Sequence, residues 1–202
     1  MEELKAALRT DALVRRSGLP SGQNAASGAA LAAALLPWSS SAGGTVAAYA
    51  AQGSEPGTAA LLAGLAATGV DVLLPVLRPD LDLDWARWSG ELVPGPRGTV
   101  EPLGPRLGCD AVAACGLVVV PALAVDRTGT RLGRGGGSYD RALARSTGWC
   151  VAALHPGEVV DRLPSEAHDV PVHAAVLPGR GVVRMRPHPL DGGSPAPGCM
   201  KR

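Results

Sequence analysis

Aromatic residues are scarce in this sequence. Phenylalanine is absent, and aromatic residues make up only 3% of the 202 positions. Because 46% of the residues are apolar, a hydrophobic core can still form, but Leu, Val and Ala must fill it. The length suits one domain of moderate size that buries an extensive core.

Net charge is also nearly absent, at +1 at pH 7. This balance excludes the strongly basic surface by which proteins bind nucleic acid or anionic membranes, so we expect neither as a partner. The four cysteines have neither C-x-x-C nor zinc-ligand spacing. They therefore indicate reduced thiols in a cytoplasmic protein.

Long apolar runs are missing as well. The longest run near the start, residues 29–37, is too short to cross a bilayer. Glu2, Glu3 and Lys5 stand where a secretory signal peptide would begin, so we expect no such signal.

Glycine, in contrast, is concentrated in the stretch RLGRGGGSYDR, which runs from Arg131 to Arg141. Its four glycines are Gly133, Gly135, Gly136 and Gly137. A loop with so few Cβ atoms lets backbone N–H groups converge on an anion, and a following helix N-terminus adds partial positive charge. Arg131 and Arg134 supply charge-assisted donors. The stretch predicts a phosphate-binding loop.

The glycine pattern by itself is not specific. It matches neither a Walker A loop, which ends in Gly-Lys-Ser/Thr, nor the dinucleotide spacing G-x-G-x-x-G. Glycine richness alone is equally consistent with a flexible turn between a strand and a helix. An apolar segment, LVVVPALAVD at residues 117–126, precedes the loop, and a predicted helix at residues 139–145 follows it.

The N-terminal segment, residues 3–16, predicts an amphipathic helix with Leu4, Leu8 and Ala12 on one stripe. Lys5 and Arg9 lie four residues apart, so they stack on a neighbouring face and repel each other mildly. Periodicity alone favours a solvated face for this pair over an anion site.

Glu55 has two interpretations. Ser54 and Pro56 predict that a helix begins here and runs to about residue 68, with Ser54 as its N-cap. Glu55 would then be a first-turn acid that complements the helix dipole. It also follows a predicted buried strand, residues 45–50, and α/β sheets bind ligands beyond such strand ends.

Strands and helices alternate along the remaining chain. Further strands are predicted at residues 70–76, 81–88, 117–120, 149–154 and 174–177, with a second helix at 24–36, a loop at 37–44 and an irregular segment at 90–108. This alternation predicts a three-layer α/β/α fold around a mostly parallel sheet, a Rossmann-like single domain over residues 1–185. Residues 186–202, rich in Pro and Gly, are expected to form a disordered tail.

Seven motifs, in this order, resemble those of the 5-formyltetrahydrofolate cyclo-ligase (5,10-methenyltetrahydrofolate synthetase) family. They are KAALR, AAYAAQGSE, VDVLLPV, VEPLG, VPALAVD, RLGRGGGSYDRAL and LPSEAHDVPV. The likeness extends from Lys5 to about Leu177. It implies an enzyme that uses ATP and magnesium (Mg2+) to convert 5-formyltetrahydrofolate to 5,10-methenyltetrahydrofolate, with release of ADP and phosphate.

The resemblance also implies a role for each matching residue. Arg134 and Tyr139 would be catalytic, Ala50 and Glu55 would bind the substrate, and Asp140 and Asp169 would hold the metal. ATP would contact Lys5, Arg9, Arg131, Gly133, Arg134, Gly135, Gly136, Gly137, Ser138 and Tyr139.

Three neighbouring residues receive lesser roles. We expect Asp126 to brace its own turn and His168 to lie at the surface. The family usually has a tyrosine where this chain has Ser138, and we interpret Ser138 as the N-cap of the following helix.

The implied partner is 5-formyltetrahydrofolate, in its mono- or polyglutamylated form, and the expected assembly is a monomer in the cytoplasm. One alternative is a non-catalytic folate- or nucleotide-binding paralogue on the same scaffold. Another is an α/β enzyme such as a sugar-phosphate isomerase, which would not need ATP. Folate-dependent ADP release would separate the three.

Overall fold

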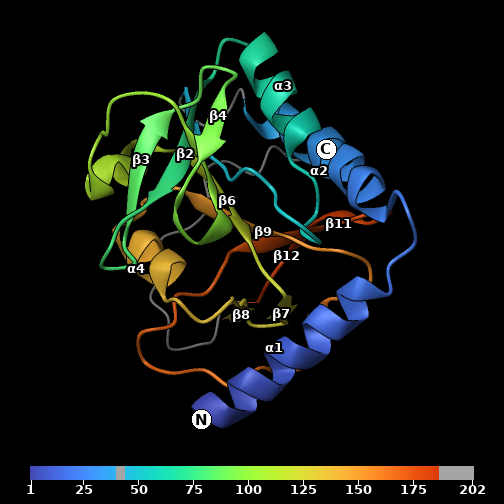
Figure 1. Cartoon of the computed structure of the whole chain (residues 1–202). Coiled ribbons are helices and arrows are strands. Elements are labelled where there is room, and N and C mark those ends of the chain that lie inside the picture. The colour runs from blue at the N-terminus through green and yellow to red at the C-terminus, as the bar shows by residue number, and fades with distance from the viewer. Residues whose placement is uncertain (40–43, 187–202) are drawn as a thin grey trace.

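A computed structural model describes residues 1–39 and 44–186. Its centre is a seven-stranded sheet with the strand order β12-β11-β9-β6-β1-β2-β3 (Figure 1). The strands are β1 (Thr45–Ala47), β2 (Asp71–Leu77), β3 (Leu83–Arg87), β6 (Leu117–Pro121), β9 (Trp149–Ala153), β11 (Ala174–Leu177) and β12 (Gly181–Arg184). The five inner strands are parallel, and the edge strands β3 and β12 pair antiparallel.

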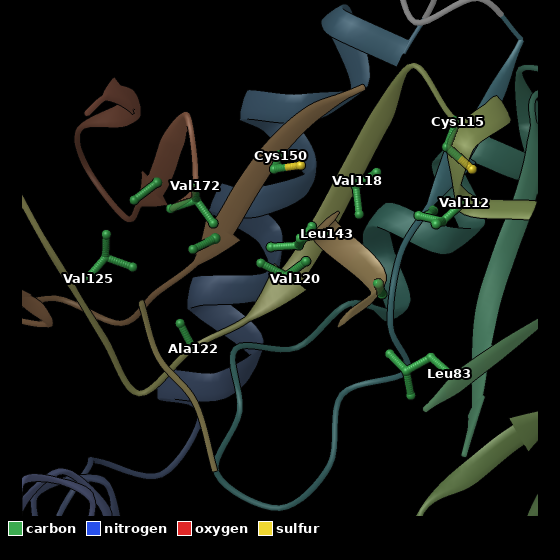
Figure 2. Close-up of a cluster of buried hydrophobic side chains, with 14 of the residues drawn as sticks. Leu83, Val112, Cys115, Val118, Val120, Ala122, Val125, Leu143, Cys150 and Val172 are labelled. Carbon is green, nitrogen blue, oxygen red and sulfur yellow. The ribbon is translucent and has the colours of Figure 1, made fainter. Parts of the chain in front are cut away.

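Helices cover both faces of this sheet. Helices α2 (Gln23–Ser39) and α3 (Ala59–Ala67) pack on one face, and α4 (Ser138–Arg145) packs on the other with the 3-10 helix η2 (Cys109–Ala114). Successive residues of β6 alternate between the two cores because a strand points its side chains to opposite faces. Figure 2 shows the core under α4, which is filled almost entirely by aliphatic side chains. The predicted three-layer α/β fold is confirmed.

Helix α1 (Glu2–Ser17) lies outside these layers, against the small sheet β10-β7-β8, which is formed by Val159–Val160, Ala124–Asp126 and Arg131–Leu132. Ala12 is buried and Leu8 is partly buried there, but Leu4 is exposed. Lys5 and Arg16 are buried instead. The solvated face predicted for Lys5 from periodicity is therefore wrong.

The third predicted helix begins later than expected. Helix α3 starts at Ala59, so Ser54 is not its cap and Glu55 is not a first-turn acid. The reason is a local turn, in which the backbone N–H of Gln52 donates to the Glu55 carboxylate at 2.9 Å. Thr58 takes the cap position without a side-chain cap bond, and its hydroxyl accepts a bond from the Ala51 N–H at 3.0 Å.

Other boundaries also differ. Helix α2 continues through Pro37, because a proline in the last turn costs only one backbone bond near the helix end. The segment predicted to be irregular contains a hairpin of β4 (Leu92–Pro94) and β5 (Val100–Pro102), joined through the short 3-10 turn η1 (Pro96–Gly98). Strand β12 was not predicted. The expected tail lies outside the described residues from position 187 onward.

Two negative predictions concern the described part of the chain. Within residues 1–39 and 44–186, no helix combines the length and hydropathy needed to cross a membrane. Cys109, Cys115 and Cys150 are free thiols, as predicted, while Cys199 falls outside the described residues.

Candidate functional site

A pocket of about 440 Å³ opens at the carboxyl ends of the parallel strands. Tyr49 and Ala50 follow β1 into it, Leu77 ends β2 beside it, and Pro121 ends β6. Strand β1 lies between β2 and β6, so the strand order reverses here. Open α/β sheets bind ligands at such a reversal.

Helix α1 places Lys5 and Arg9 on the pocket wall. The Lys5 Nζ lies 2.7 Å from an Asp169 oxygen and 2.9 Å from a Glu166 oxygen. Burial acts to lower the pKa of Lys5, but the bonds and charges of these two carboxylates outweigh it and raise that pKa. The Arg9 Nε donates to the Gly133 carbonyl at 3.0 Å. Both cations therefore face a site and not bulk solvent.

All four glycines of the RLGRGGGSYDR stretch line the pocket. Gly135 (φ 97°) and Gly137 (φ 64°) adopt left-handed backbone conformations that favour glycine. A Cβ atom on Gly135 would lie 3.2 Å from the Arg9 Cζ, which is closer than ordinary packing allows. The glycines therefore permit both the sharp turn and the close approach of Arg9.

Ser138 lines the pocket but does not cap α4. The cap position is Gly137, with no side-chain cap bond, and Ser138 is the first helical residue. The N-cap predicted for Ser138 is therefore wrong, because the loop enters the helix through a left-handed glycine.

Three side chains meet where the loop enters α4. The Arg131 Nη2 lies 2.8 Å from an Asp140 oxygen, and its guanidinium carbon is 5.8 Å from the centre of the Tyr139 ring. Burial raises the pKa of Tyr139, so its phenol stays protonated and can donate a hydrogen bond. The Val170 N–H approaches the same Asp140 oxygen at 3.4 Å, which brings the segment carrying Asp169 next to Asp140.

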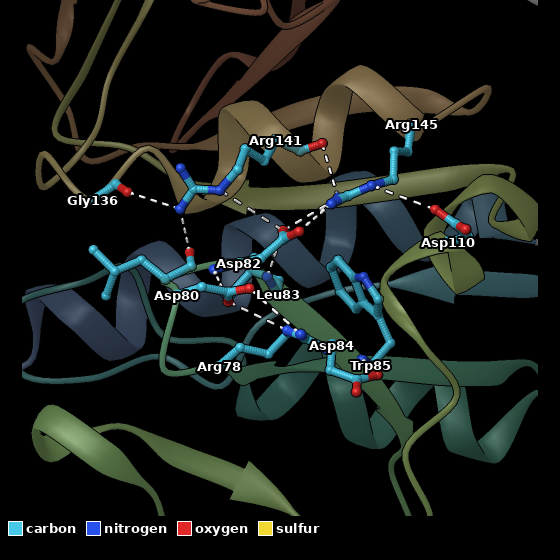
Figure 3. Close-up of polar contacts among 11 residues, drawn as sticks. Arg78, Asp80, Asp82, Leu83, Asp84, Trp85, Asp110, Gly136, Arg141 and Arg145 are labelled. Carbon is cyan, nitrogen blue, oxygen red and sulfur yellow. Dashed lines mark hydrogen bonds and ion pairs between the residues drawn. The ribbon is translucent and has the colours of Figure 1, made fainter.

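Arginines of α4 fasten the glycine loop to the opposite wall, as Figure 3 shows. The Arg141 Nη2 donates to the Leu81 carbonyl at 2.6 Å and to the Gly136 carbonyl at 3.2 Å. Arg145 forms an ion pair with Asp82, the residue after Leu81. Since Leu81 lines the pocket, these bonds fix its width between the loop and the turn before β3.

Glu55, expected to bind the substrate, and Arg134, expected to bind ATP, form an ion pair. The Arg134 Nε lies 3.4 Å from a Glu55 oxygen. The Glu55 side chain is only 11% exposed, whereas that of Arg134 is 57% exposed. The expected nucleotide and substrate halves therefore meet at this pair.

The two aspartates that the resemblance implies as metal ligands, Asp140 and Asp169, both line the pocket. Within residues 1–39 and 44–186, no group of three or more His, Cys, Asp and Glu side chains could hold a metal. Mg2+ usually binds one or two carboxylates together with phosphate oxygens and water. The two aspartates fit Mg2+ that arrives with a nucleotide.

The sequence patterns did not identify several residues that line the pocket. Arg16 continues the helical spacing of Lys5 and Arg9, a signal that could have found it. Its Nε pairs with Glu158 at 2.6 Å, and both side chains are almost fully buried. Gln52 and Arg97 gave no comparable signal.

The minor predictions can also be placed. The Asp126 carboxylate accepts bonds from the backbone of Thr128, Thr130 and Leu163, so it braces the turn as predicted. His168 is exposed, as expected, and lies beside Asp169. Trp85 and Trp88 pack in the two cores and do not line the pocket.

Known proteins share this sequence and fold. A model of the 5-formyltetrahydrofolate cyclo-ligase family matches residues 1–178. The 5-formyltetrahydrofolate cyclo-ligase of Mycolicibacterium smegmatis is 41% identical over 193 residues, which cover 90% of this chain and 97% of that protein. The protein of the same name from Escherichia coli is 33% identical over 144 residues, covering 67% and 79%.

Solved structures agree with these sequence matches. The NMR structure of Aquifex aeolicus 5,10-methenyltetrahydrofolate synthetase superposes with a TM-score of 0.75 at 27% identity, covering 92% of this chain and 94% of that one. The Mycoplasma pneumoniae synthetase superposes with a TM-score of 0.65 at 19% identity, covering 86% and 97%, and supports the fold alone.

Proposed function

This chain belongs to the 5-formyltetrahydrofolate cyclo-ligase family, and on that premise we propose that it uses ATP and Mg2+ to convert 5-formyltetrahydrofolate to 5,10-methenyltetrahydrofolate. The observation that supports this most is the single pocket shared by Lys5, Arg9, the glycine loop and Glu55. A synthetase needs its nucleotide and its acceptor side by side, and the Arg134–Glu55 pair joins the two halves.

The proposed reaction has two stages. The formyl oxygen attacks the γ-phosphorus of ATP, and ADP leaves with the electrons of the broken bond. The second folate nitrogen then attacks the formyl carbon, loses its proton and closes a five-membered ring. Phosphate departs with the former formyl oxygen, so the products are 5,10-methenyltetrahydrofolate, ADP and phosphate.

The nucleotide half supplies positive charge and backbone donors. Lys5, Arg9 and Arg131 would contact the phosphates beside the glycine-loop N–H groups. Arg134 would stabilise charge on the transferring phosphoryl group, and the neutral phenol of Tyr139 would donate to the same region. Such catalysis consists mainly of positioning and charge stabilisation.

The substrate half is built around Glu55 and Ala50. The Glu55 carboxylate, held by the Gln52 N–H, would accept hydrogen bonds from ring N–H groups of the folate, next to the Ala50 backbone. Because Glu55 touches Arg134, a folate bound to Glu55 would present its formyl group close to the phosphoryl position.

Asp140 and Asp169 would hold Mg2+ together with phosphate oxygens of ATP. The bound metal supplies neutralisation of phosphate charge. In the structure without ligand, Arg131 and Lys5 balance these two carboxylates.

We also propose that the protein is a monomer in the cytoplasm. The free thiols of Cys109, Cys115 and Cys150 suit a reducing compartment.

The decisive experiment follows methenyl-folate absorbance and ADP release from 5-formyltetrahydrofolate, with ATP or Mg2+ left out in turn. Both products should form in equal amounts only in the complete mixture. Tight folate or ATP binding without any product would instead support the non-catalytic paralogue. Loss of 5-formyltetrahydrofolate without ATP would contradict the proposed reaction.

A further inference from the structure

Six cationic side chains line the pocket, and five are already paired with carboxylates of the protein. The pairs are Lys5 with Asp169, Arg9 with Glu2, Arg16 with Glu158, Arg131 with Asp140 and Arg134 with Glu55. The sixth cation, Arg97, has no ion pair or side-chain hydrogen bond within the part of the chain that the structure describes. An anion can therefore bind Arg97 without competing with a protein carboxylate for it.

The backbone at Arg97 is unusual as well. Its φ of 55° and ψ of 28° are left-handed, in the turn that joins β4 to β5. Among the described residues other than glycine, only Leu81 shares a positive φ, and Leu81 also lines the pocket. A large side chain at a position where glycine would be less strained often marks a functional site.

Hydrogen bonds place the turn on the Glu55 side. In the orientation that satisfies both ends of its amide, the Gln52 side chain donates to the Gly98 carbonyl at 2.5 Å and accepts from the Val100 N–H at 3.1 Å. The backbone of the same Gln52 holds the Glu55 carboxylate. Glu55 is nearly buried and Arg97 is exposed, so the path from Glu55 to Arg97 leads from the pocket interior toward its mouth.

We propose that Arg97 binds a carboxylate of the glutamate tail of the folate substrate and thereby sets substrate affinity; this rests on the proposed function. A folate whose ring contacts Glu55 extends its glutamate tail away from the ring, toward the mouth. The planar guanidinium pairs with carboxylates through two parallel N–H bonds. The formyl group and the phosphoryl group lie at the other end of the substrate, so Arg97 is a specificity residue and takes no part in the chemical step.

The test compares 5-formyltetrahydrofolate with 5-formyltetrahydropteroate, which lacks the glutamate tail. Dissociation constants are measured without ATP for the wild type, Arg97→Gln, Arg97→Lys and Arg97→Gly. Arg97→Gln should weaken the binding of 5-formyltetrahydrofolate roughly five- to tenfold, in the range expected for an exposed charge-assisted contact. Its affinity for the tail-free compound should equal that of the wild type, and kcat should not change.

The other variants separate charge from backbone strain. Arg97→Lys should recover part of the affinity, whereas Arg97→Gly, which relieves the strain but lacks the charge, should bind as weakly as Arg97→Gln. Arg162→Gln is the matched control, because Arg162 is exposed and lies outside the pocket, and it should bind like the wild type.

Two results would overturn the assignment of Arg97 alone: an equal loss of affinity for both compounds in Arg97→Gln, or wild-type affinity for both in Arg97→Gly. A wild-type protein that binds neither compound would overturn the proposed function together with the inference.

Discussion

The glycine-loop side and the hairpin side of the pocket differ in how their cations are balanced. Four cations beside the glycine loop, Lys5, Arg9, Arg131 and Arg134, each pair with a protein carboxylate. On the hairpin side Arg97 has no such partner in the described chain. An anion on the hairpin side therefore meets a cation without a protein partner, whereas an anion on the glycine-loop side competes with carboxylates unless a cation binds them.

The Arg16–Glu158 ion pair differs from the pairs on both sides, because it is almost fully buried. The side chains are 2% and 8% exposed, and the Arg16 Nη2 also donates to the Ala122 carbonyl at 2.5 Å. The backbone N–H of His155 donates to Glu158, and the His155 ring bonds the Ser54 carbonyl. This network joins α1 to the turn that carries Glu55, so it supports the pocket wall.

The largest effect should come from breaking that buried pair. Glu158→Gln leaves Arg16 buried without a counter-charge and should lower the free energy of unfolding by about 3–5 kcal/mol. Glu2→Gln breaks the pair of Arg9 with a mostly exposed carboxylate and should cost far less. Urea unfolding measures the loss of stability in both variants. Equal losses would show that the buried Arg16–Glu158 pair contributes no more to stability than the exposed Arg9–Glu2 pair.

The next effect concerns the phosphate-binding role of the glycine loop. Arg134→Ala should raise the KM for ATP and lower turnover, by about 1.5–3 kcal/mol in kcat/KM, because a charge-assisted phosphate contact is lost. Arg134→Lys keeps the charge and should retain part of the activity. Unchanged ATP kinetics in folded Arg134→Ala would contradict this role.

Glu55→Gln tests the substrate half. Affinity for 5-formyltetrahydrofolate should fall about tenfold, equivalent to about 1.4 kcal/mol, because one charged acceptor is lost. Since Glu55 also pairs with Arg134, ATP affinity should change less, and in either direction. Calorimetric titration of each ligand measures both affinities. A fall in ATP affinity with unchanged folate affinity would contradict the substrate-binding role of Glu55.

The Lys5–Asp169 pair predicts a pH dependence. Burial acts to raise the pKa of Asp169, but the bonds from Lys5 and the Glu166 N–H outweigh it, so the pKa lies below its usual value. The stability from this pair is present above the unfolded-state pKa of about 3.9 and is lost as pH falls through the lower folded pKa. The stability difference between the wild type and Asp169→Asn should therefore shrink between pH 6 and pH 3, and a difference independent of pH would exclude the ion pair as its cause.

The smallest effect is expected at Ser138. Because its side chain caps nothing, Ser138→Ala should change stability by less than about 0.5 kcal/mol. Ser138→Tyr would add a ring on the pocket wall and should tighten one of the two ligands by about 0.5–1.5 kcal/mol. Thermal melts and ligand titrations measure these effects, and a strongly destabilised Ser138→Ala would restore a structural role.

Local patterns predicted most strands of the sheet and the glycine loop, because buried parallel strands and clustered glycines act through nearby residues. These patterns gave the wrong environment for Lys5, because helical periodicity predicts that a cation faces solvent. The carboxylates of Glu166 and Asp169, more than 160 positions away, make its burial possible. The resemblance to a family placed Lys5 correctly on the pocket.

The predicted start of α3 was wrong for a similar reason. Ser54 and Pro56 have the composition of a helix start, but tertiary contacts hold them in a turn: the Tyr49 hydroxyl donates to the Pro56 carbonyl, and the His155 ring bonds the Ser54 carbonyl. Arg97 could not have been found at all, because its importance depends on which other cations are paired in three dimensions.

The contrast between the two sides is tested most directly by titrating ATP and 5-formyltetrahydrofolate separately, with and without Mg2+. Carboxylates pair every cation on the glycine-loop side, so Mg2+ should tighten ATP by about tenfold or more, about 1.4 kcal/mol. The affinity for 5-formyltetrahydrofolate should stay the same, because Arg97 has no carboxylate partner in the described chain that Mg2+ would have to neutralise. Equal ATP affinity in the presence and absence of Mg2+ would contradict this account.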